Sequence, residues 1–223
     1  MQEPIRKRPA ALLFDVDGTL MDTVPDLLDL TNRKLNELGR PLQTAATIER
    51  LMGMDPRHRL IHLALPENAS VPERDHALEL WERYFPEHQG LSKPFPGVVD
   101  APCSLAEQGC PLGVVSNKRQ DAVEALCEKW FPGLMDVCVG RRQGLPIKPN
   151  PYILFYAARR LKVNLEDIGY VGDTDTDMEA ARNASMQAIA VTWGFRDPVE
   201  FTGASAPDRI VSSRAQLKNI LLE

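Results

Sequence analysis

Five short apolar runs are the feature of this sequence that most constrains its fold. Most of them are rich in β-branched residues and lack polar alternation, which is typical of strands covered on both faces in a parallel sheet. Helical patterns at residues 120–130, 152–161 and 178–184 separate the later runs. Strands that alternate with helices predict an α/β fold, a doubly wound parallel sheet. The predicted strands are Ala11–Phe14, Leu112–Val115, Val137–Val139, Ile168–Val171 and Ala188–Val191.

One long interval, from about Asp22 to Ser92, breaks this alternation because it contains only helical patterns. Inserted after the first strand, it predicts a separate helical domain. Proline and glycine at its far end, in Gly90–Gly97, are typical of a linker. We therefore expect a core of residues 1–21 and 93–223 and a helical domain of residues 22–92. The helices expected in it are Pro25–Leu38, Thr47–Met52, Pro56–Leu65 and Pro72–Phe85.

The first chemically distinctive segment is Asp15-Val16-Asp17-Gly18, which directly follows the first predicted strand. In an open parallel sheet, ligands bind at the carboxyl ends of the strands. Two carboxylates two residues apart in an extended chain face the same side and repel, so one pKa should rise unless a cation intervenes. Gly18 allows a sharp turn that exposes backbone N–H groups to an anion.

A second acidic segment contains Asp173, Asp175 and Asp177, after another predicted strand and at the start of a helix. Three acids so close together favour a site for a hard cation, of which Mg²⁺ is the usual fit. On its own, this segment could equally be a set of helix N-caps. Because both acidic segments end strands of one predicted sheet, we favour a joint site.

A calcium loop of the EF-hand type does not fit either segment. Such a loop requires glycine at its sixth position. A loop that started at Asp15 would have Leu20 there, and one that started at Asp173 would have Met178.

Two further groups stand at the ends of predicted elements. Ser116 and Asn117 follow the second core strand, and Lys148 precedes a helix. Taken alone, each has an ordinary explanation, because serine often caps helices and lysine is usually a solvated surface charge.

Taken in order, DVDGTL, VVSNK, IKPNP and VGDTDTD resemble the four motifs of the haloacid dehalogenase superfamily, and the similarity covers the whole chain. The resemblance implies a Rossmann-like core with a C1 cap formed by the helical insert. More narrowly, DVDGTLMDTVPDL, KPFPGV, IKPNPYIL, VGDTDTDMEAARNA and VTWGFRD resemble the phosphoglycolate phosphatase branch. This implies a Mg²⁺-dependent phosphomonoester hydrolase that acts on a small phosphorylated metabolite.

The resemblance also implies roles for the acidic residues. Asp15 would be the nucleophile that forms an aspartyl phosphate, and Asp17 would protonate the leaving alcohol and then activate water. Mg²⁺ would be held by Asp15, the backbone carbonyl of Asp17 and Asp173. Asp177 would hold a metal-bound water or the lysine.

Substrate binding is likewise assigned by the resemblance. Within the helical insert, residues 51–59 resemble the cap loop that faces the active site, and Arg57 is the candidate for contacting a substrate carboxylate or phosphate. The alternative for Arg57 is a solvated charge on a helix face. The residues expected to bind the phosphoryl group are Gly18, Thr19, Ser116, Asn117 and Lys148.

Charge and composition limit the remaining possibilities. The net charge is −5 without a block of like charge, which argues against a nucleic-acid partner. The apolar runs are shorter than the about 18 residues of a membrane span, and a secretion signal is lacking, so we expect a cytoplasmic monomer or homodimer with reduced cysteines. Two alternatives remain open. One is another enzyme of the superfamily, such as a pyrophosphatase, sugar-phosphate phosphatase, nucleotidase or phosphomutase, and the other is a non-catalytic phosphate-binding regulator.

Overall fold

The computed structural model describes residues 8–52, 62–63, 65–66, 68–84, 90–197, 199 and 201–220. The chain divides into two compact units, one of residues 1–21 and 94–223 and the other of residues 22–93. Two short strands, β2 (Met21–Asp22) and β3 (Lys93–Pro94), lie where the chain passes from one unit to the other and pair with each other. That residues 22–92 act as a cap stays a prediction.

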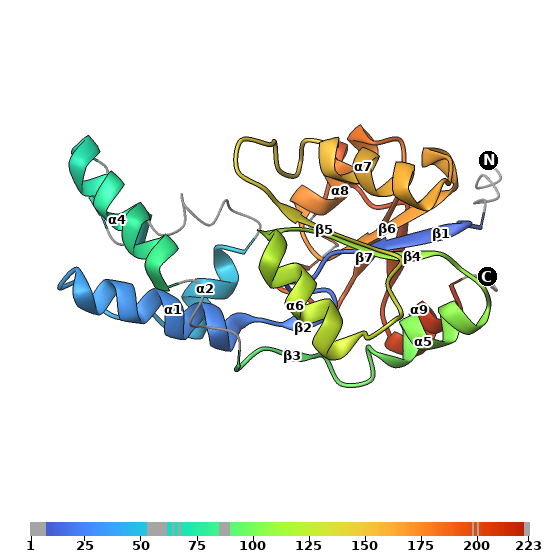
Figure 1. Ribbon diagram of the computed structural model, residues 1–223, viewed down its shortest axis with the longest axis horizontal. Helices are drawn as coiled ribbons and strands as arrows, with labels where there is room; N and C mark the ends of the chain where they lie inside the picture. The colour runs from blue at the N-terminus through green and yellow to red at the C-terminus, as the bar shows by residue number, and fades with distance from the viewer. Residues whose placement is uncertain are drawn as a thin grey trace. The chain divides into compact units, whose positions relative to one another are not determined.

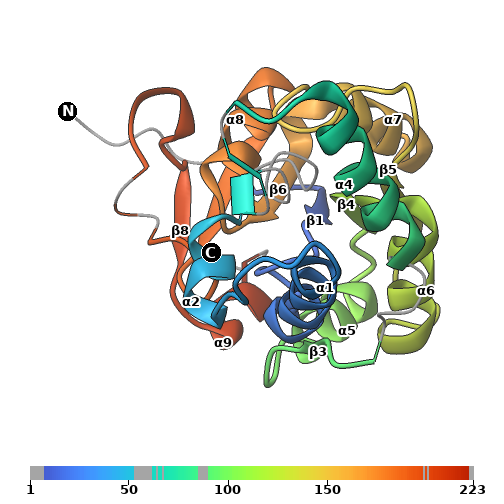
Figure 2. The ribbon, with the colours of Figure 1, turned by 90° about the vertical axis from the view of Figure 1, so that its left-hand side faces the viewer.

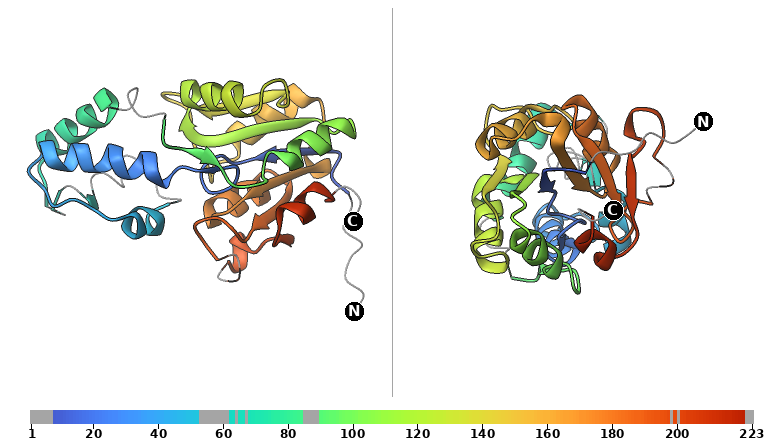
Figure 3. Two further views of the ribbon diagram at one scale, coloured as in Figure 1. Left: turned by 90° about the horizontal axis from the view of Figure 1, so that it is seen from below. Right: turned by 90° about the vertical axis from the view of Figure 1, so that its right-hand side faces the viewer.

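A six-stranded sheet forms the centre of the larger unit, with strand order β5-β4-β1-β6-β7-β8 (Figure 1). All neighbouring strands run parallel and lie side by side (Figure 3), which confirms the predicted parallel sheet. The edge strand β8 was not predicted. The strands are β1 (Ala11–Phe14), β4 (Leu112–Arg119), β5 (Val137–Arg141), β6 (Ile168–Gly172), β7 (Gln187–Val191) and β8 (Arg209–Val211).

Helices cover both faces of this sheet, as a doubly wound fold requires. Alternate residues of β1 enter two different cores: Leu12 and Phe14 pack on one face, and Ala11 and Leu13 on the other. The first core is closed by α5 (Asp100–Glu107), α6 (Gln120–Trp130) and α9 (Arg214–Lys218), and the second by α7 (Tyr152–Leu161) and α8 (Asp175–Asn183).

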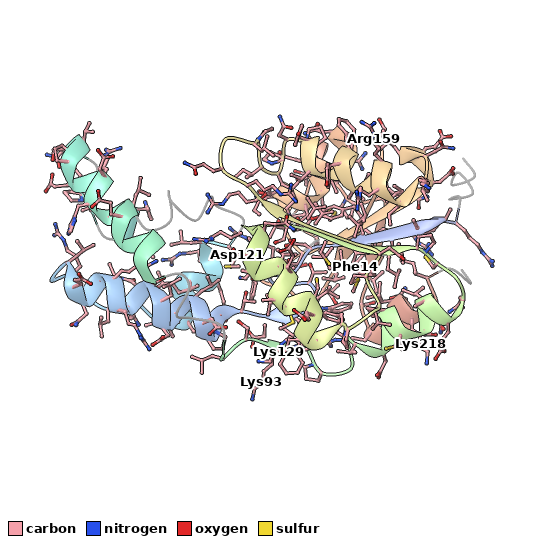
Figure 4. The ribbon with its side chains drawn as sticks, viewed as in Figure 1. Phe14, Lys93, Asp121, Lys129, Arg159 and Lys218 are labelled. Atoms are coloured by element: carbon pink, nitrogen blue, oxygen red, sulfur yellow. The ribbon has the colours of Figure 1, made fainter. Side chains whose placement is uncertain are left out.

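The two helical layers are visible in the figures. Figure 2 shows α7 and α8 on one side of the strands and α5 and α9 on the other. Phe14 lies inside the unit, whereas Arg159 of α7 and Lys218 of α9 lie at its surface (Figure 4). Burial on both faces explains why the strands read as continuous apolar runs.

The register of the sheet decides where the site forms. Phe14, the last residue of β1, is paired with Val114 on one side and with Val171 on the other. The residues that come just after these three paired positions therefore lie next to one another at the same edge. This edge receives Asp15, Ser116 and Asp173.

The smaller unit is helical where it is described, with α1 (Val24–Glu37), α2 (Ala45–Arg50) and α4 (Val71–Tyr84). Leu30 and Leu35 of α1 form a small core with Ala77 of α4. The predicted helix at residues 56–65 lies largely outside the described residues. No helix in the described ranges has both the length and the apolar character required to cross a membrane.

Candidate active site

Asp15 begins the site, one residue beyond the end of β1. Its backbone N–H donates to the carbonyl oxygen of Val171 over 2.9 Å, which extends the β1–β6 ladder by one step. The side chain is buried, and one carboxylate oxygen lies 2.9 Å from Nζ of Lys148. Burial raises the pKa of Asp15 to about 6, although the Lys148 ammonium opposes this effect. Asp15 is therefore a carboxylate whose charge depends on neighbouring cations.

Lys148 is the buried cation of the site, with 3% of its side chain exposed. Besides its contact with Asp15, its Nζ donates to Oδ1 of Asp177 over 2.6 Å and to the Tyr170 hydroxyl over 2.7 Å. Burial disfavours its charge, but the carboxylates of Asp15 and Asp177 outweigh burial and raise the pKa of Lys148. Lys148 is thus charged and uses its three N–H bonds within the site, which differs from a solvated surface lysine.

Asn117 fixes the backbone of Lys148. Its side-chain amide donates to the Lys148 carbonyl oxygen over 3.1 Å, and its Oδ1 accepts the Lys148 backbone N–H over 2.9 Å. Ser116 is buried beside it, and its Oγ accepts the backbone N–H of Lys118 over 3.3 Å. Asn117 therefore positions the lysine, and direct contacts of Ser116 and Asn117 with phosphate stay predictions.

Asp173 lies at the end of β6 and is fully buried. The Thr19 hydroxyl donates to its Oδ1 over 3.0 Å, and the Phe195 backbone N–H donates to its Oδ2 over 2.9 Å. Burial, followed by repulsion from Asp177 and Asp15, raises the pKa of Asp173 well above its usual value. The Thr19 hydroxyl thus donates its hydrogen bond to the Asp173 carboxylate, and its predicted contact with phosphate stays a prediction.

Glycines leave the space that Asp173 occupies. A Cβ on Gly18 or on Gly194 would lie 2.1 Å or 2.2 Å, respectively, from the nearest atom of the Asp173 side chain. Gly18 also has a φ of +88°, which favours glycine. Its N–H donates to the Met21 carbonyl oxygen over 2.9 Å and so closes the turn. Gly18 is therefore required for close packing as well as for the turn, and its amide is engaged within the loop.

Asp177 has two functions in the structure. Its Oδ2 accepts the backbone N–H and the hydroxyl of Thr174 in a capping box at the start of α8. Its Oδ1 is the oxygen that binds Lys148. Helix capping, the alternative considered for this acidic segment, therefore applies to Asp177, which also accepts a hydrogen bond from Lys148. Asp175 is exposed in the first turn of α8 and does not join the buried group.

The buried acids fit a divalent cation. Oxygens of Asp15, Asp173 and Asp177 all lie within 4.8 Å of one another. Among the residues that the structure describes, the cation that contacts these carboxylates is the ammonium of Lys148, so two negative charges are left without compensation when all three acids are ionised. A doubly charged, oxygen-preferring ion would balance them.

Asp17 points to a different partner. Its Oδ1 lies 2.9 Å from Nζ of Lys118, near the end of β4. The two side chains are partly exposed, at 18% and 13%. The carboxylate of Asp17 therefore lies outside the buried group, and metal binding by its backbone carbonyl stays a prediction. Arg57 lies outside the described residues.

Sequence reasoning missed three residues of this site: Lys118, Tyr170 and Phe195. Tyr170 carried a signal, because a hydroxyl in an otherwise apolar buried strand needs a hydrogen-bond partner. Lys118 stood at the end of a predicted strand, where ligands bind. Phe195 acts through its backbone N–H, which residue type does not reveal.

Comparisons with known proteins agree with this geometry. Residues 12–191 match the family described as haloacid dehalogenase-like hydrolases. A phosphoglycolate phosphatase of Nitrosococcus oceani is 31% identical over 96% of this chain and 97% of its own length. One of Xanthomonas campestris pv. campestris is 35% identical over 84% of this chain and 85% of its own length. A solved structure from Lactobacillus delbrueckii subsp. bulgaricus is 30% identical, has a TM-score of 0.84, and covers 96% of this chain and 99% of that chain.

Proposed function

Since the chain belongs to the haloacid dehalogenase-like hydrolases, we propose that it is a phosphatase that cleaves small phosphomonoesters through a phosphorylated Asp15. The observation that carries this proposal is the buried Asp15 carboxylate with Lys148 at 2.9 Å, beside Asp173 and Asp177. A nucleophilic carboxylate needs these cationic neighbours, because its target is itself an anion.

Asp15 attacks phosphorus in this scheme and displaces the alcohol. The attack brings two anions together in a site with little water, where repulsion is weakly screened. Lys148 offsets part of that repulsion and exchanges its contact with Asp15 for a phosphoryl oxygen as Asp15 attacks. Asp177, Tyr170 and Asn117 keep the lysine in place. Ser116 is proposed as a second phosphate contact.

Asp17 transfers the protons. It donates a proton to the leaving oxygen and later accepts one from the water that cleaves the acyl phosphate. Two carboxylates thus carry different roles because their surroundings differ. Asp15 is buried against Lys148, whereas Asp17 is partly exposed.

The proposed cofactor is Mg²⁺, bound by Asp15 and Asp173 with the backbone carbonyl of Asp17. When bound, Mg²⁺ supplies positive charge that stabilises the transferring phosphoryl group. Both oxygens of Asp177 already accept hydrogen bonds from Lys148 or Thr174, so we assign Asp177 to positioning Lys148.

Phosphoglycolate phosphatases are the relatives that cover nearly the whole chain, so 2-phosphoglycolate is the first substrate to test. We retain Arg57 as a predicted substrate contact and a cytoplasmic monomer or homodimer as the predicted form. Pyrophosphate, sugar phosphates and nucleotides belong in the same screen.

The experiment compares wild type, Asp15→Asn and Asp175→Asn for phosphate release from 2-phosphoglycolate, with Mg²⁺ and with a chelator. Asp175 is the matched control, because it is exposed and outside the buried group. We expect Asp15→Asn to lose at least about three orders of magnitude in kcat, and Asp175→Asn to retain wild-type activity. In acid-quenched wild type, intact mass should show one added phosphoryl group, which Asp15→Asn should lack.

Two results would contradict the proposal. One is equal activity of Asp15→Asn and wild type on every substrate that wild type cleaves. The other is unchanged activity after complete removal of divalent cations.

A further inference from the structure

Lys118 has no part in the mechanism described above, although its ammonium stands at the site. It lies two residues after Ser116, near the end of β4. Its Nζ lies 2.9 Å from Oδ1 of Asp17, and its side chain is only 13% exposed. A lysine held this close to the proton-transferring carboxylate lies next to the leaving group.

The two lysines of the site differ in how many N–H bonds they still offer. An ammonium has three donors. Those of Lys148 face Asp15, Asp177 and Tyr170. Among the residues that the structure describes, the ammonium of Lys118 has Asp17 as its partner and keeps two donors for another acceptor. That acceptor must be polar and accessible from the site.

Distance places this ammonium near the leaving oxygen. A proton transfer from Asp17 requires a hydrogen bond of about 2.7 Å to that oxygen. Nζ of Lys118 therefore lies within about 6 Å of the leaving oxygen if Oδ1 is the donor, and within about 8 Å if Oδ2 is. In 2-phosphoglycolate, one methylene group separates the ester oxygen from the carboxylate, whose nearer oxygen is about 3 Å away. An ion pair between that carboxylate and Lys118 fits this separation.

We propose that Lys118 binds the carboxylate of the leaving group and thereby selects small phosphomonoesters with an anion one carbon from the ester oxygen. The inference rests on the proposed phosphatase function. Without Lys118, such a substrate would place its carboxylate beside Asp17, which becomes an anion as it gives its proton to the leaving oxygen, and like charges so close repel. With Lys118, one ammonium is shared by both carboxylates. A neutral ester gains nothing from this contact.

The test uses two esters that differ in the carboxylate, 2-phosphoglycolate and ethyl phosphate. The variants are Lys118→Met, Lys118→Arg and the control Lys129→Met, whose lysine lies at the surface of α6 (Figure 4). We expect Lys118→Met to lower kcat/KM for 2-phosphoglycolate about ten- to a hundredfold more than for ethyl phosphate, as expected for one charge-assisted hydrogen bond. Lys118→Arg should recover part of the difference, and Lys129→Met should behave as wild type.

Binding gives a second readout that does not depend on turnover. In the Asp15→Asn background, calorimetry should show that Lys118→Met weakens the Kd of 2-phosphoglycolate at least about tenfold, with little change for ethyl phosphate. Equal losses on both esters would overturn the inference and would assign Lys118 to positioning Asp17. A wild type that cleaves both esters equally well would overturn it too, with the phosphatase function intact. If wild type cleaves no phosphomonoester at all, the proposed function itself fails.

Discussion

Replacing Lys148 with methionine tests the electrostatic account of the site most directly. Methionine keeps most of the aliphatic length and removes the ammonium. The change removes the cation that lies 2.9 Å from Asp15 and 2.6 Å from Asp177, both of which are buried. It also leaves the Tyr170 hydroxyl without its donor.

The structure indicates the size of the effect. Removing one partner of a buried ion pair costs about 3–5 kcal/mol, because the remaining charge is left in a poorly solvated place. Lys118→Met is the matched control. It removes a lysine from a carboxylate at the same 2.9 Å, but in a partly exposed pair. Fully exposed pairs contribute about 0–1 kcal/mol, and the partly exposed Lys118–Asp17 pair lies between that limit and a buried pair. Lys148→Met should therefore lower the free energy of unfolding by at least about 1 kcal/mol more than Lys118→Met.

The loss should also depend on pH. Burial already raises the pKa of Asp15 to about 6 in the folded state, above its unfolded value near 4. A carboxyl group with a raised folded pKa binds more protons when folded, so the free energy of unfolding falls as pH rises between those two values. Without Lys148 the folded pKa rises further, and the fall continues to higher pH. Lys148→Met should therefore be most destabilising near pH 8 and less so near pH 5.5, where Asp15 is largely protonated.

Urea denaturation of the full chain in the presence of a chelator, at pH 5.5 and pH 8, measures these quantities. Phosphatase activity is measured on the same samples and should be lost at both pH values. The reasoning would be refuted if Lys148→Met cost no more than Lys118→Met at pH 8, or if its cost were the same at both pH values. If the variant does not fold at pH 8, the pH 5.5 measurement still compares the two lysines.

Three further changes test other contacts of the site. Tyr170→Phe removes hydrogen bonds to Lys148 and to the Val115 carbonyl, so it should cost about 1–3 kcal/mol in urea denaturation and lower kcat. Gly194→Ala would place a Cβ 2.2 Å from Asp173 and should lower stability by about 1–3 kcal/mol, whereas Gly90→Ala, with nothing within 4 Å, should be near neutral in the same assay. Mg²⁺ should raise the melting temperature more at pH 8 than at pH 5.5, because burial raises the pKa of Asp15 and Asp173, and protons then compete for them at low pH. An Mg²⁺ effect that is larger at pH 5.5 would contradict that account.

The central strands were predictable because burial on both faces leaves an unbroken apolar run. Ile168–Gly172 is buried at every position and was found almost to its ends. The edge strand β8 was not found, since it has three residues and pairs on one side, with Ile210 43% exposed. Helix α5 was missed as well, because it is short and presents few apolar side chains to the sheet.

The sequence allowed the acidic residues of the site to be predicted from their positions after strands, but it did not reveal their hydrogen-bond partners. The acids were predictable because they follow strands whose carboxyl ends share one edge. Their partners depend on three-dimensional proximity: Thr19 binds Asp173 across 154 positions of sequence, and Phe195 does so through a backbone group. The same limit applies to Asp175. It is close to the other acids in the sequence, but in helix α8 its side chain is exposed to solvent.

The partners of the three buried acids also explain why they are not equivalent. Asp177 has Lys148 on one oxygen and a capping hydroxyl on the other, so its charge is largely compensated within the protein. In the described part of the chain, the donors to Asp173 are neutral, namely the Thr19 hydroxyl and the Phe195 amide, and they orient the carboxylate without cancelling its charge. Asp15 shares Lys148 with Asp177 and is compensated in part. The uncompensated charge is therefore concentrated on Asp15 and Asp173, which are the carboxylates where the proposed divalent cation would bind, whereas Asp177 contacts the lysine.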